Sequence, residues 1–168
     1  MSDRFAPAPD VPESHSGTSG LRLTLEVGAV SDVGAVRQSN EDSYGLAEDY
    51  AAKLTSASQE LLERKGRMYA VADGMGGHAS GEIASRLAIE RTFTDYYGNP
   101  TTDVPSALQA AIQQANLAII TQGQGETDLL KMGSTIVAGL FRAGQLWVAN
   151  VGDSRAYLFR AGQARQLT

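Results

Sequence analysis

The chain has 168 residues, enough for one domain with a substantial core; 42% of the residues are apolar and 20% are charged. Its formal net charge of −5 argues against a nucleic-acid-binding surface and against contact with an anionic membrane. The chain has no cysteine and only two histidines, so disulfides and metal sites built on thiolates or several histidines are excluded, and any metal must be bound mainly by oxygen, which favours magnesium, manganese or calcium.

The N-terminal residues 1–20 are predicted to form a disordered tail, because they hold three of the five prolines together with several serines and glycines. One domain is predicted over 21–168. No apolar run in the sequence approaches the length of a membrane span, and the N-terminus lacks the basic and then apolar segments of a signal peptide. Together with the absence of cysteine, these features favour a cytoplasmic protein.

The first half of the domain predicts two strands separated by a loop and a weakly helical segment. Apolar and polar residues alternate over 21–27, which predicts a strand with one buried face. Residues 31–45 are polar and contain glycines, as expected for the end of a strand and a loop, and residues 47–65 carry mixed charge with weak helical character. The apolar run 67–73 predicts a buried strand that ends in a glycine-rich segment.

Two helices are predicted after this strand. The first extends from about 79 to 97, with an apolar stripe at helical spacing and Glu82 in its first turn. The second has Asp103 as its N-cap and Pro105 in its first turn. Residues 121–131 are polar and contain glycine, so they predict a loop.

The last part of the chain predicts antiparallel strands over 133–141, 145–151 and 155–160. The links between them are short, which favours pairing of neighbours. The pentapeptide Phe-Arg-Ala-Gly-Gln occurs twice, at 141–145 and 159–163, and predicts the same turn at both places. A strand, two helices and then an antiparallel meander indicate an α+β fold with helices packed on antiparallel sheet.

Three acidic segments lie where a predicted strand meets a loop, a position that holds exposed side chains on rigid backbone. Asp73 follows an apolar strand directly, and the glycine after it lets a bound ion reach the Gly74 carbonyl as well as the carboxylate. Glu41 and Asp42 repel each other unless a cation intervenes. Arg37, four residues before Glu41, has the planar fork suited to phosphate. The third segment is 152–155.

Each segment alone has a plain structural alternative. Asp73 is also suited to cap the following helix, Arg37 with its neighbouring acids matches a solvated surface pattern, and Asp153 is an ordinary turn residue. Residues 74–79 also match the glycine fingerprint of dinucleotide-binding domains. That alternative requires a parallel strand after the helix, whereas a second helix follows, so only a parallel sheet would support it.

The segments together are more specific than any one of them. In order, the chain contains Val33-Gly34, Asn40-Glu41-Asp42-Ser43, Ala72-Asp73-Gly74-Met75-Gly76-Gly77-His78, Gly133-Ser134-Thr135 and Asn150-Val151-Gly152-Asp153-Ser154-Arg155-Ala156-Tyr157. Over roughly residues 26–168 the sequence closely resembles the bacterial branch of the metal-dependent serine/threonine protein phosphatases of type 2C, the PPM family. The resemblance implies a four-layer αββα sandwich, in which two antiparallel sheets are flanked by helices, with a binuclear manganese or magnesium centre at one end.

The resemblance also implies which residues bind metal. Asp42 would bind one ion, Asp73 would bridge two, and the Gly74 carbonyl would be a further ligand. Asp153 would help to hold a third, weaker ion. A water that bridges two divalent ions is acidified and attacks phosphorus in line, while the ions neutralise the developing negative charge.

Two further residues would act on water and substrate. Glu41 would hold a metal-bound water and Arg37 would bind the substrate phosphate. Met75 stands where many eukaryotic members have a histidine, so general-acid help from that position is not expected, and His78 is expected to pack at the helix start. The implied substrates are phosphoproteins, with a bacterial serine/threonine kinase and its targets as partners.

The family pattern continues past the strand after Asp153 with a mobile flap and two further metal-binding aspartates. Because nothing in the chain matches them, we expect the C-terminal strands and helices of the sandwich to be missing and the chain as given to be inactive or nearly so. The alternative function is a non-catalytic module that keeps the phosphatase fold and binds phosphoproteins or regulates a partner. A manganese requirement separates the two functions, since a pure interaction module needs no metal.

Overall fold

The computed structural model describes residues 24–76, 79–124 and 132–168, which contain seven strands and four helices. The elements are β1 (Asp42–Leu46), α1 (Ala47–Leu54), α2 (Ser58–Lys65), β2 (Arg67–Met75), α3 (Ala79–Gly98), α4 (Val104–Gln124), β3 (Gly133–Ser134), β4 (Ile136–Arg142), β5 (Gln145–Val151), β6 (Tyr157–Arg160) and β7 (Gln163–Gln166). The larger sheet has the order β1-β2-β4-β5, with β3 paired to β2, and β6 and β7 form a second, two-stranded sheet. All pairings are antiparallel, so the predicted α+β class is confirmed.

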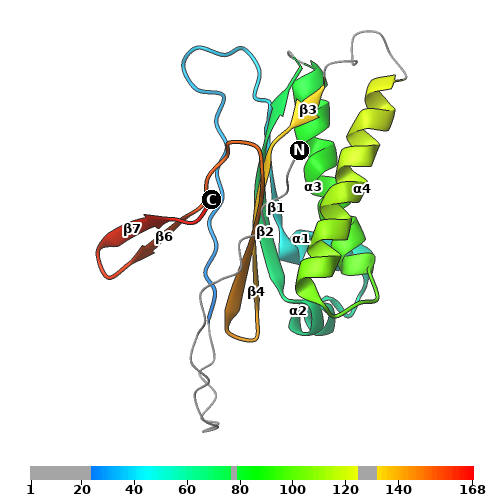
Figure 1. The fold of residues 1–168 in the computed structure, drawn as a ribbon, viewed down its shortest axis with the longest axis vertical. Helices are drawn as coiled ribbons and strands as arrows, with labels where there is room; N and C mark the ends of the chain where they lie inside the picture. Colours follow the sequence, from blue (N-terminus) through cyan, green and yellow to red (C-terminus); the bar gives the residue numbers. More distant parts are fainter. Residues whose placement is uncertain (1–23, 77–78, 125–131) are drawn as a thin grey trace, which may run out of the picture.

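Helices α3 and α4 cover one face of the larger sheet, and residues 24–41 run along the opposite face (Figure 1). The core lies between this sheet and the two helices. Strand β2 contributes every second side chain to it, as the period of a half-buried strand requires. The fully or nearly fully buried side chains include Met68, Ala70, Ala72, Ala84, Ala88, Ile89, Phe93, Leu108 and Leu140. None of the described helices is both long and apolar enough to span a bilayer.

The register between β1 and β2 places Asp42 opposite Asp73 and Gly45 opposite Ala70. Gly45 is packed under the ring of Phe93 on α3, where an added Cβ would lie 2.6 Å from the ring atom Cε2. Ser43, on the same face of β1 as Gly45, lies 2.9 Å from the Ser85 hydroxyl of α3. The alternate residues of β1, Asp42 among them, therefore face away from the helices.

Helix α4 begins as the sequence predicts. Asp103 is its N-cap, because the Ser106 N–H donates to Asp103 Oδ2 at 3.0 Å, and Pro105 lies in the first turn. The helix continues to Gln124, so the start of the predicted loop over 121–131 is wrong, and 125–131 lie outside the described residues. The predicted tail 1–20 and His78 also lie outside them.

Two strand predictions are wrong. Residues 24–27 form no strand, because no described segment pairs with them and alternation alone does not stabilise an isolated strand. The third predicted strand begins at Tyr157 rather than at 155 and pairs with β7 instead of β5. The chain leaves β5 at Gly152, whose φ of 93° turns it out of the strand direction.

The repeated pentapeptide forms the same tight turn twice, as predicted. Ala143 and Gly144, between β4 and β5, have φ angles of 49° and 76°. Ala161 and Gly162, between β6 and β7, have φ angles of 50° and 75°. Two consecutive residues with positive φ match the right-handed twist of a hairpin, so each copy closes one.

Candidate metal centre

The two carboxylates that carry the metal hypothesis lie at one end of the larger sheet. Asp42 begins β1 and faces Asp73 near the end of β2, and both side chains are exposed. The loop that leads to Asp42 is held in place, since the Asp42 N–H donates to Asn40 Oδ1 at 3.0 Å and Asn40 Nδ2 donates to Ser31 Oγ at 2.7 Å. These two hydrogen bonds fix the backbone on the N-terminal side of Asp42.

Charge around Asp42 is uncompensated. Partial burial raises the pKa of Asp42, and the facing Asp73 carboxylate, which also forms a hydrogen bond with it, and the charge of Glu41 raise it further. Neither of the two ion pairs among the described residues involves any of these three carboxylates. A divalent cation between the carboxylates would remove this repulsion.

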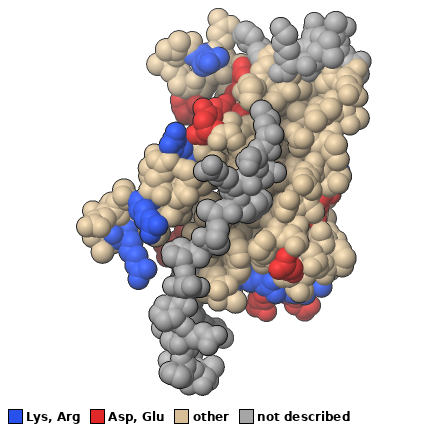
Figure 2. Space-filling view, viewed as in Figure 1, with Lys and Arg blue, Asp and Glu red and all other residues tan. Residues whose placement is uncertain are grey.

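A cavity of about 210 Å³ contains most of the predicted site. Figure 2 shows acidic side chains gathered at the upper end of the molecule, where the loop before β1 meets the end of β2. The cavity is lined by Asp32, Val33, Arg37, Ser39, Asn40, Glu41, Asp42, Asp73 and Gly74. Five of the six predicted site residues are thus together.

The sixth predicted residue, Asp153, does not line this cavity. Its neighbour Ser154 lines an adjoining cavity of about 360 Å³, which also borders Asp42 and Asp73. The link after β5 therefore reaches the carboxylate pair through Ser154, and Asp153 lies next to it in the chain with an exposed side chain.

A close contact of two glycines shapes the site. A Cβ on Gly74 would lie 1.9 Å from the Gly81 carbonyl oxygen. A Cβ on Gly81 would lie 2.2 Å from Glu41 Oε2 and 3.1 Å from the Gly74 carbonyl oxygen. Gly81 lies in the first turn of α3, and its lack of a side chain makes room for the predicted ligand Gly74, through its carbonyl, and for the carboxylate of Glu41, which is predicted to hold a metal-bound water.

Several of these site residues were not predicted from the sequence. Asp32 lies in a loop that gives no signal there beyond its polarity, and Asn40 was named only as part of the ordered motif, without a role in the site. Gly81 does give a signal in the sequence, because glycine inside a helix lowers the stability of the helix by about 1 kcal/mol relative to alanine. A glycine at such a position therefore indicates a close contact. The contact is with Glu41.

The donor set suits a hard cation. Two carboxylates and a backbone carbonyl are the ligands that manganese and magnesium accept, and no sulfur or histidine is among the residues lining the cavity. Within residues 24–76, 79–124 and 132–168, however, no three carboxylates or histidines are grouped closely enough to hold an ion. The chain brings the pair Asp42 and Asp73 together, with Gly74 beside it.

Comparison with known proteins decides the family. The family model described as Protein phosphatase 2C matches residues 28–168, which include all six predicted site residues. The chain belongs to the protein phosphatase 2C family. This confirms the resemblance found in the sequence and the sandwich fold that it implies. A dinucleotide-binding domain is excluded, because β2 is antiparallel to both β1 and β4.

Relatives in the protein phosphatase 2C family are bacterial serine/threonine phosphatases. PstP of Mycobacterium tuberculosis is 40% identical over 148 residues, which are 88% of this chain and 25% of PstP. The phosphatase stp of Listeria innocua is 36% identical over 143 residues, 82% of this chain and 51% of stp. This chain therefore spans about a quarter of the length of PstP and about half of the length of stp.

Solved structures support the fold. The catalytic domain of PstP in complex with two manganese ions matches with a TM-score of 0.65 and 38% identity, over 83% of this chain and 53% of that chain. Staphylococcus aureus Stp1 matches with a TM-score of 0.67 and 26% identity, over 86% of this chain and 56% of that one.

Proposed function

We propose that this chain contributes to the hydrolysis of phosphoserine and phosphothreonine in proteins by a manganese- or magnesium-dependent site. The observation that carries the proposal is the opposition of Asp42 and Asp73 without a cationic partner among the described residues. Arg37 and Glu41 border the same cavity. The serine/threonine phosphatases among the relatives support the substrate class.

The proposed ligands are the carboxylates of Asp42 and Asp73 and the carbonyl of Gly74. When bound there, two divalent ions would acidify a water molecule and offset negative charge on the phosphoryl oxygens. The carboxylate of Glu41 would accept a hydrogen bond from that water and hold it in position. The exposed guanidinium of Arg37, which forms no ion pair with a described residue, binds the substrate phosphate through its planar fork.

The remaining assignments extend this proposal. Asp153 helps to hold a third, weaker ion beside the pair. Phosphoproteins are the substrates, among them a bacterial serine/threonine kinase and its targets, and the site works in the cytoplasm. The alternative is a non-catalytic module of the same fold, which would bind phosphoproteins without a metal.

Calorimetric titration with Mn²⁺ tests the proposal. We expect weak binding by the 168-residue chain, because no third carboxylate or histidine joins the pair among the described residues. Binding should disappear in Asp73→Ala and persist in Asp103→Ala, which removes a helix cap far from the site. Equal binding by wild type and Asp73→Ala would refute the metal site, and binding of a phosphopeptide without Mn²⁺ would favour the non-catalytic module.

Hydrolysis of p-nitrophenyl phosphate with Mn²⁺ measures activity separately. For this chain we expect turnover near background, since the carboxylates of Asp42 and Asp73 balance only part of the charge of two divalent metal ions. Robust turnover that Asp73→Ala abolishes would contradict the expected inactivity and still support the phosphatase function.

A further inference from the structure

Thr135 holds the backbone of Asp73 from both sides. The Asp73 N–H donates to Thr135 Oγ1 at 3.0 Å, and the Thr135 N–H donates to the Asp73 carbonyl oxygen at 2.9 Å. Thr135 is buried, with 6% of its surface exposed. Hydrogen bonds shielded in this way are costly to break, so the peptide groups around Asp73 have little freedom. The proposed function gives the segment Gly133-Ser134-Thr135 no role, and these contacts show that its last residue holds the backbone of Asp73.

The same threonine contacts the link that carries Asp153. Thr135 Oγ1 lies 2.6 Å from Ser154 Oγ, a hydrogen bond between two hydroxyls. Gly152 packs on the other branch of the side chain, and a Cβ there would lie 2.7 Å from Thr135 Cγ2. Both branches of Thr135 are therefore in contact with residues 152–154, one by a hydrogen bond and one by close packing.

Ser154 also lines the cavity of about 360 Å³ that borders Asp42 and Asp73. The hydrogen bonds from the Ser154 hydroxyl and from the Asp73 N–H meet at one atom, Thr135 Oγ1. Ser134 adds a weaker contact, since its hydroxyl lies 3.2 Å from the Asp73 carbonyl oxygen.

We propose that Thr135 and Ser154 are positioning residues that couple the link carrying Asp153 to the orientation of the Asp73 carboxylate. This deepens, and rests on, the proposed metal-dependent function. Neither hydroxyl is required to touch substrate or ion. They act through the Asp73 backbone, as groups that orient a metal ligand from behind do, and such groups commonly change metal affinity by one to two orders of magnitude.

Amide hydrogen exchange of Asp73, measured by NMR on the full chain without metal, tests the clamp directly. In Thr135→Val the Asp73 N–H loses its acceptor, and we expect its exchange to be roughly fivefold faster or more. Thr135→Ser keeps the hydroxyl and should restore slow exchange. Thr121→Val is the matched control, because the Thr121 hydroxyl donates to the Leu117 carbonyl within α4. Unchanged Asp73 exchange in folded Thr135→Val would overturn the proposal.

Paramagnetic broadening of the Gly74 amide during Mn²⁺ titration tests the coupling. We expect Thr135→Val to weaken apparent Mn²⁺ affinity about tenfold, Ser154→Ala to weaken it less, and Thr135→Ser to bring it back towards wild type. The double variant Thr135→Val/Ser154→Ala should bind no more weakly than Thr135→Val alone, because Ser154 acts through Thr135. Additive losses would overturn the coupling.

The two measurements separate this inference from the function on which it rests. If wild type gives no broadening at Gly74, the proposed metal site fails, while hydrogen exchange still decides whether Thr135 holds Asp73. If wild type binds Mn²⁺ and all variants bind it equally, the metal site stands and the positioning roles of Thr135 and Ser154 are overturned. Should Thr135→Val not fold, Ser154→Ala still decides the coupling, because a Mn²⁺ affinity equal to that of wild type would overturn it.

Discussion

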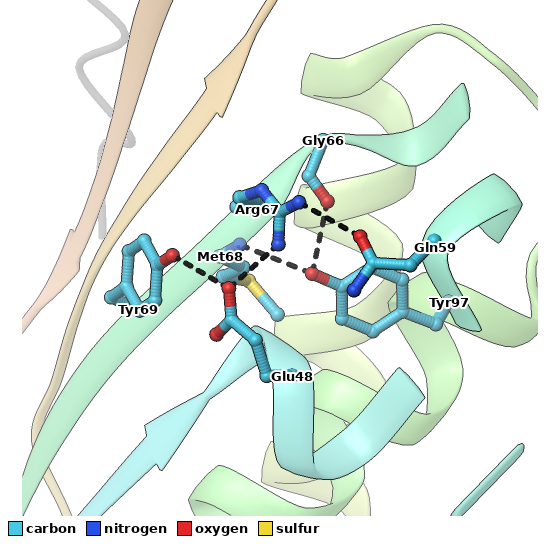
Figure 3. Close-up of polar contacts among 7 residues, drawn as sticks. All are labelled: Glu48, Gln59, Gly66, Arg67, Met68, Tyr69 and Tyr97. Atoms are coloured by element: carbon cyan, nitrogen blue, oxygen red, sulfur yellow. Dashed lines mark hydrogen bonds and ion pairs between the residues drawn. The ribbon is translucent and has the colours of Figure 1, made fainter. Parts of the chain in front are cut away.

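Strand β2 begins at an arginine that is paired with a carboxylate and carries near its end a carboxylate that has no cationic partner among the described residues. At its start, Arg67 donates to Glu48 at 2.7 Å and to Gln59 at 3.1 Å, and the Tyr69 hydroxyl donates to the same Glu48 oxygen at 3.1 Å (Figure 3). At its end, Asp73 faces Asp42 with no cation paired to either among the described residues. We call the start of β2, around Arg67, the closed end, and the end of β2, around Asp73, the open end.

The closed end also contains a buried cation. Lys65, with 2% of its surface exposed, donates to the carbonyls of Asn99 and Thr101 at 2.9 and 2.8 Å and lies 4.7 Å from the centre of the Tyr96 ring. Burial is the main cause of its lowered pKa. Lys65 thereby ties the end of α2 to the turn between α3 and α4.

A tyrosine completes this network. The Tyr97 hydroxyl accepts from the Met68 N–H and donates to the Gly66 carbonyl, both at 3.1 Å (Figure 3). Burial raises its pKa, and burial also raises the pKa of Tyr96 to about 12. Polar groups at this end stabilise the fold because each is matched, whereas those at the other end cost stability and remain available to a ligand. The difference indicates which end is structural and which end is functional.

The largest effect is expected at the closed end. Lys65→Met removes two charge-assisted hydrogen bonds and leaves two carbonyls without a donor, so the free energy of unfolding should fall by about 3 kcal/mol. Urea denaturation followed by circular dichroism measures this. Lys53→Met is the control: Lys53 also lies over a tyrosine ring but is exposed, and the loss should be about 0.5 kcal/mol. Equal losses would remove the contrast between the two ends.

A smaller effect is expected at the open end, and on binding rather than on folding. In Gly81→Ala the new methyl group displaces the Glu41 carboxylate, which sits at the end of a flexible side chain, so the fold is retained while Mn²⁺ affinity falls about tenfold. Gly98→Ala, in the same helix but with open space around its Cα, should leave affinity unchanged. Calorimetry on both variants checks this. A folded Gly81→Ala with wild-type affinity would exclude Glu41 from the site.

The smallest effect has the opposite sign. Asp73→Asn removes one of two facing carboxylates, so without divalent ions at neutral pH the free energy of unfolding should rise by about 0.5 kcal/mol. Asp49→Asn, in the first turn of α1, should instead lower it slightly. Denaturation in EDTA and low salt measures both. A loss of stability in Asp73→Asn would show that the pair is not under repulsion.

The pH dependence of wild type sharpens the same prediction. The pKa of Asp42 is raised in the folded state, so the folded protein binds a proton more readily than the unfolded chain. Its contribution to stability should therefore increase as pH falls from neutral through the folded-state pKa, and this increase should shrink in Asp73→Asn. The comparison is made from denaturation midpoints over the acidic range.

The sequence was most informative where a feature lies within one element. An apolar run predicted β2, and apolar residues at helical spacing predicted α3 and α4. Asp103 is the cap of α4 because the group that it binds, the Ser106 N–H, is close to it in the chain. Asp42 and Asp73 were predicted because strand ends hold exposed carboxylates on rigid backbone. Such features depend on a few adjacent residues, which a local pattern contains.

The remainder depends on contacts between distant segments. Alternation over 21–27 predicted a strand, but a strand needs a neighbour, and none of the described segments provides one. Gly81 and Thr135 belong to the site only because α3 and the link between β3 and β4 approach the end of β2, which no pattern within either segment determines. The turn at Gly152 likewise directs β6 away from β5 in a way that short links alone did not indicate.

The packing of Gly45 under Phe93 has a consequence for the carboxylate pair. If β1 slipped by two residues along β2, Ser43 or Ala47 would come under the ring, and each has a Cβ for which there is no space. A slip by one residue would turn Asp42 towards the helices. The buried ring of Phe93 therefore fixes the alignment of β1 with β2, and this alignment places the exposed carboxylates of Asp42 and Asp73 opposite each other.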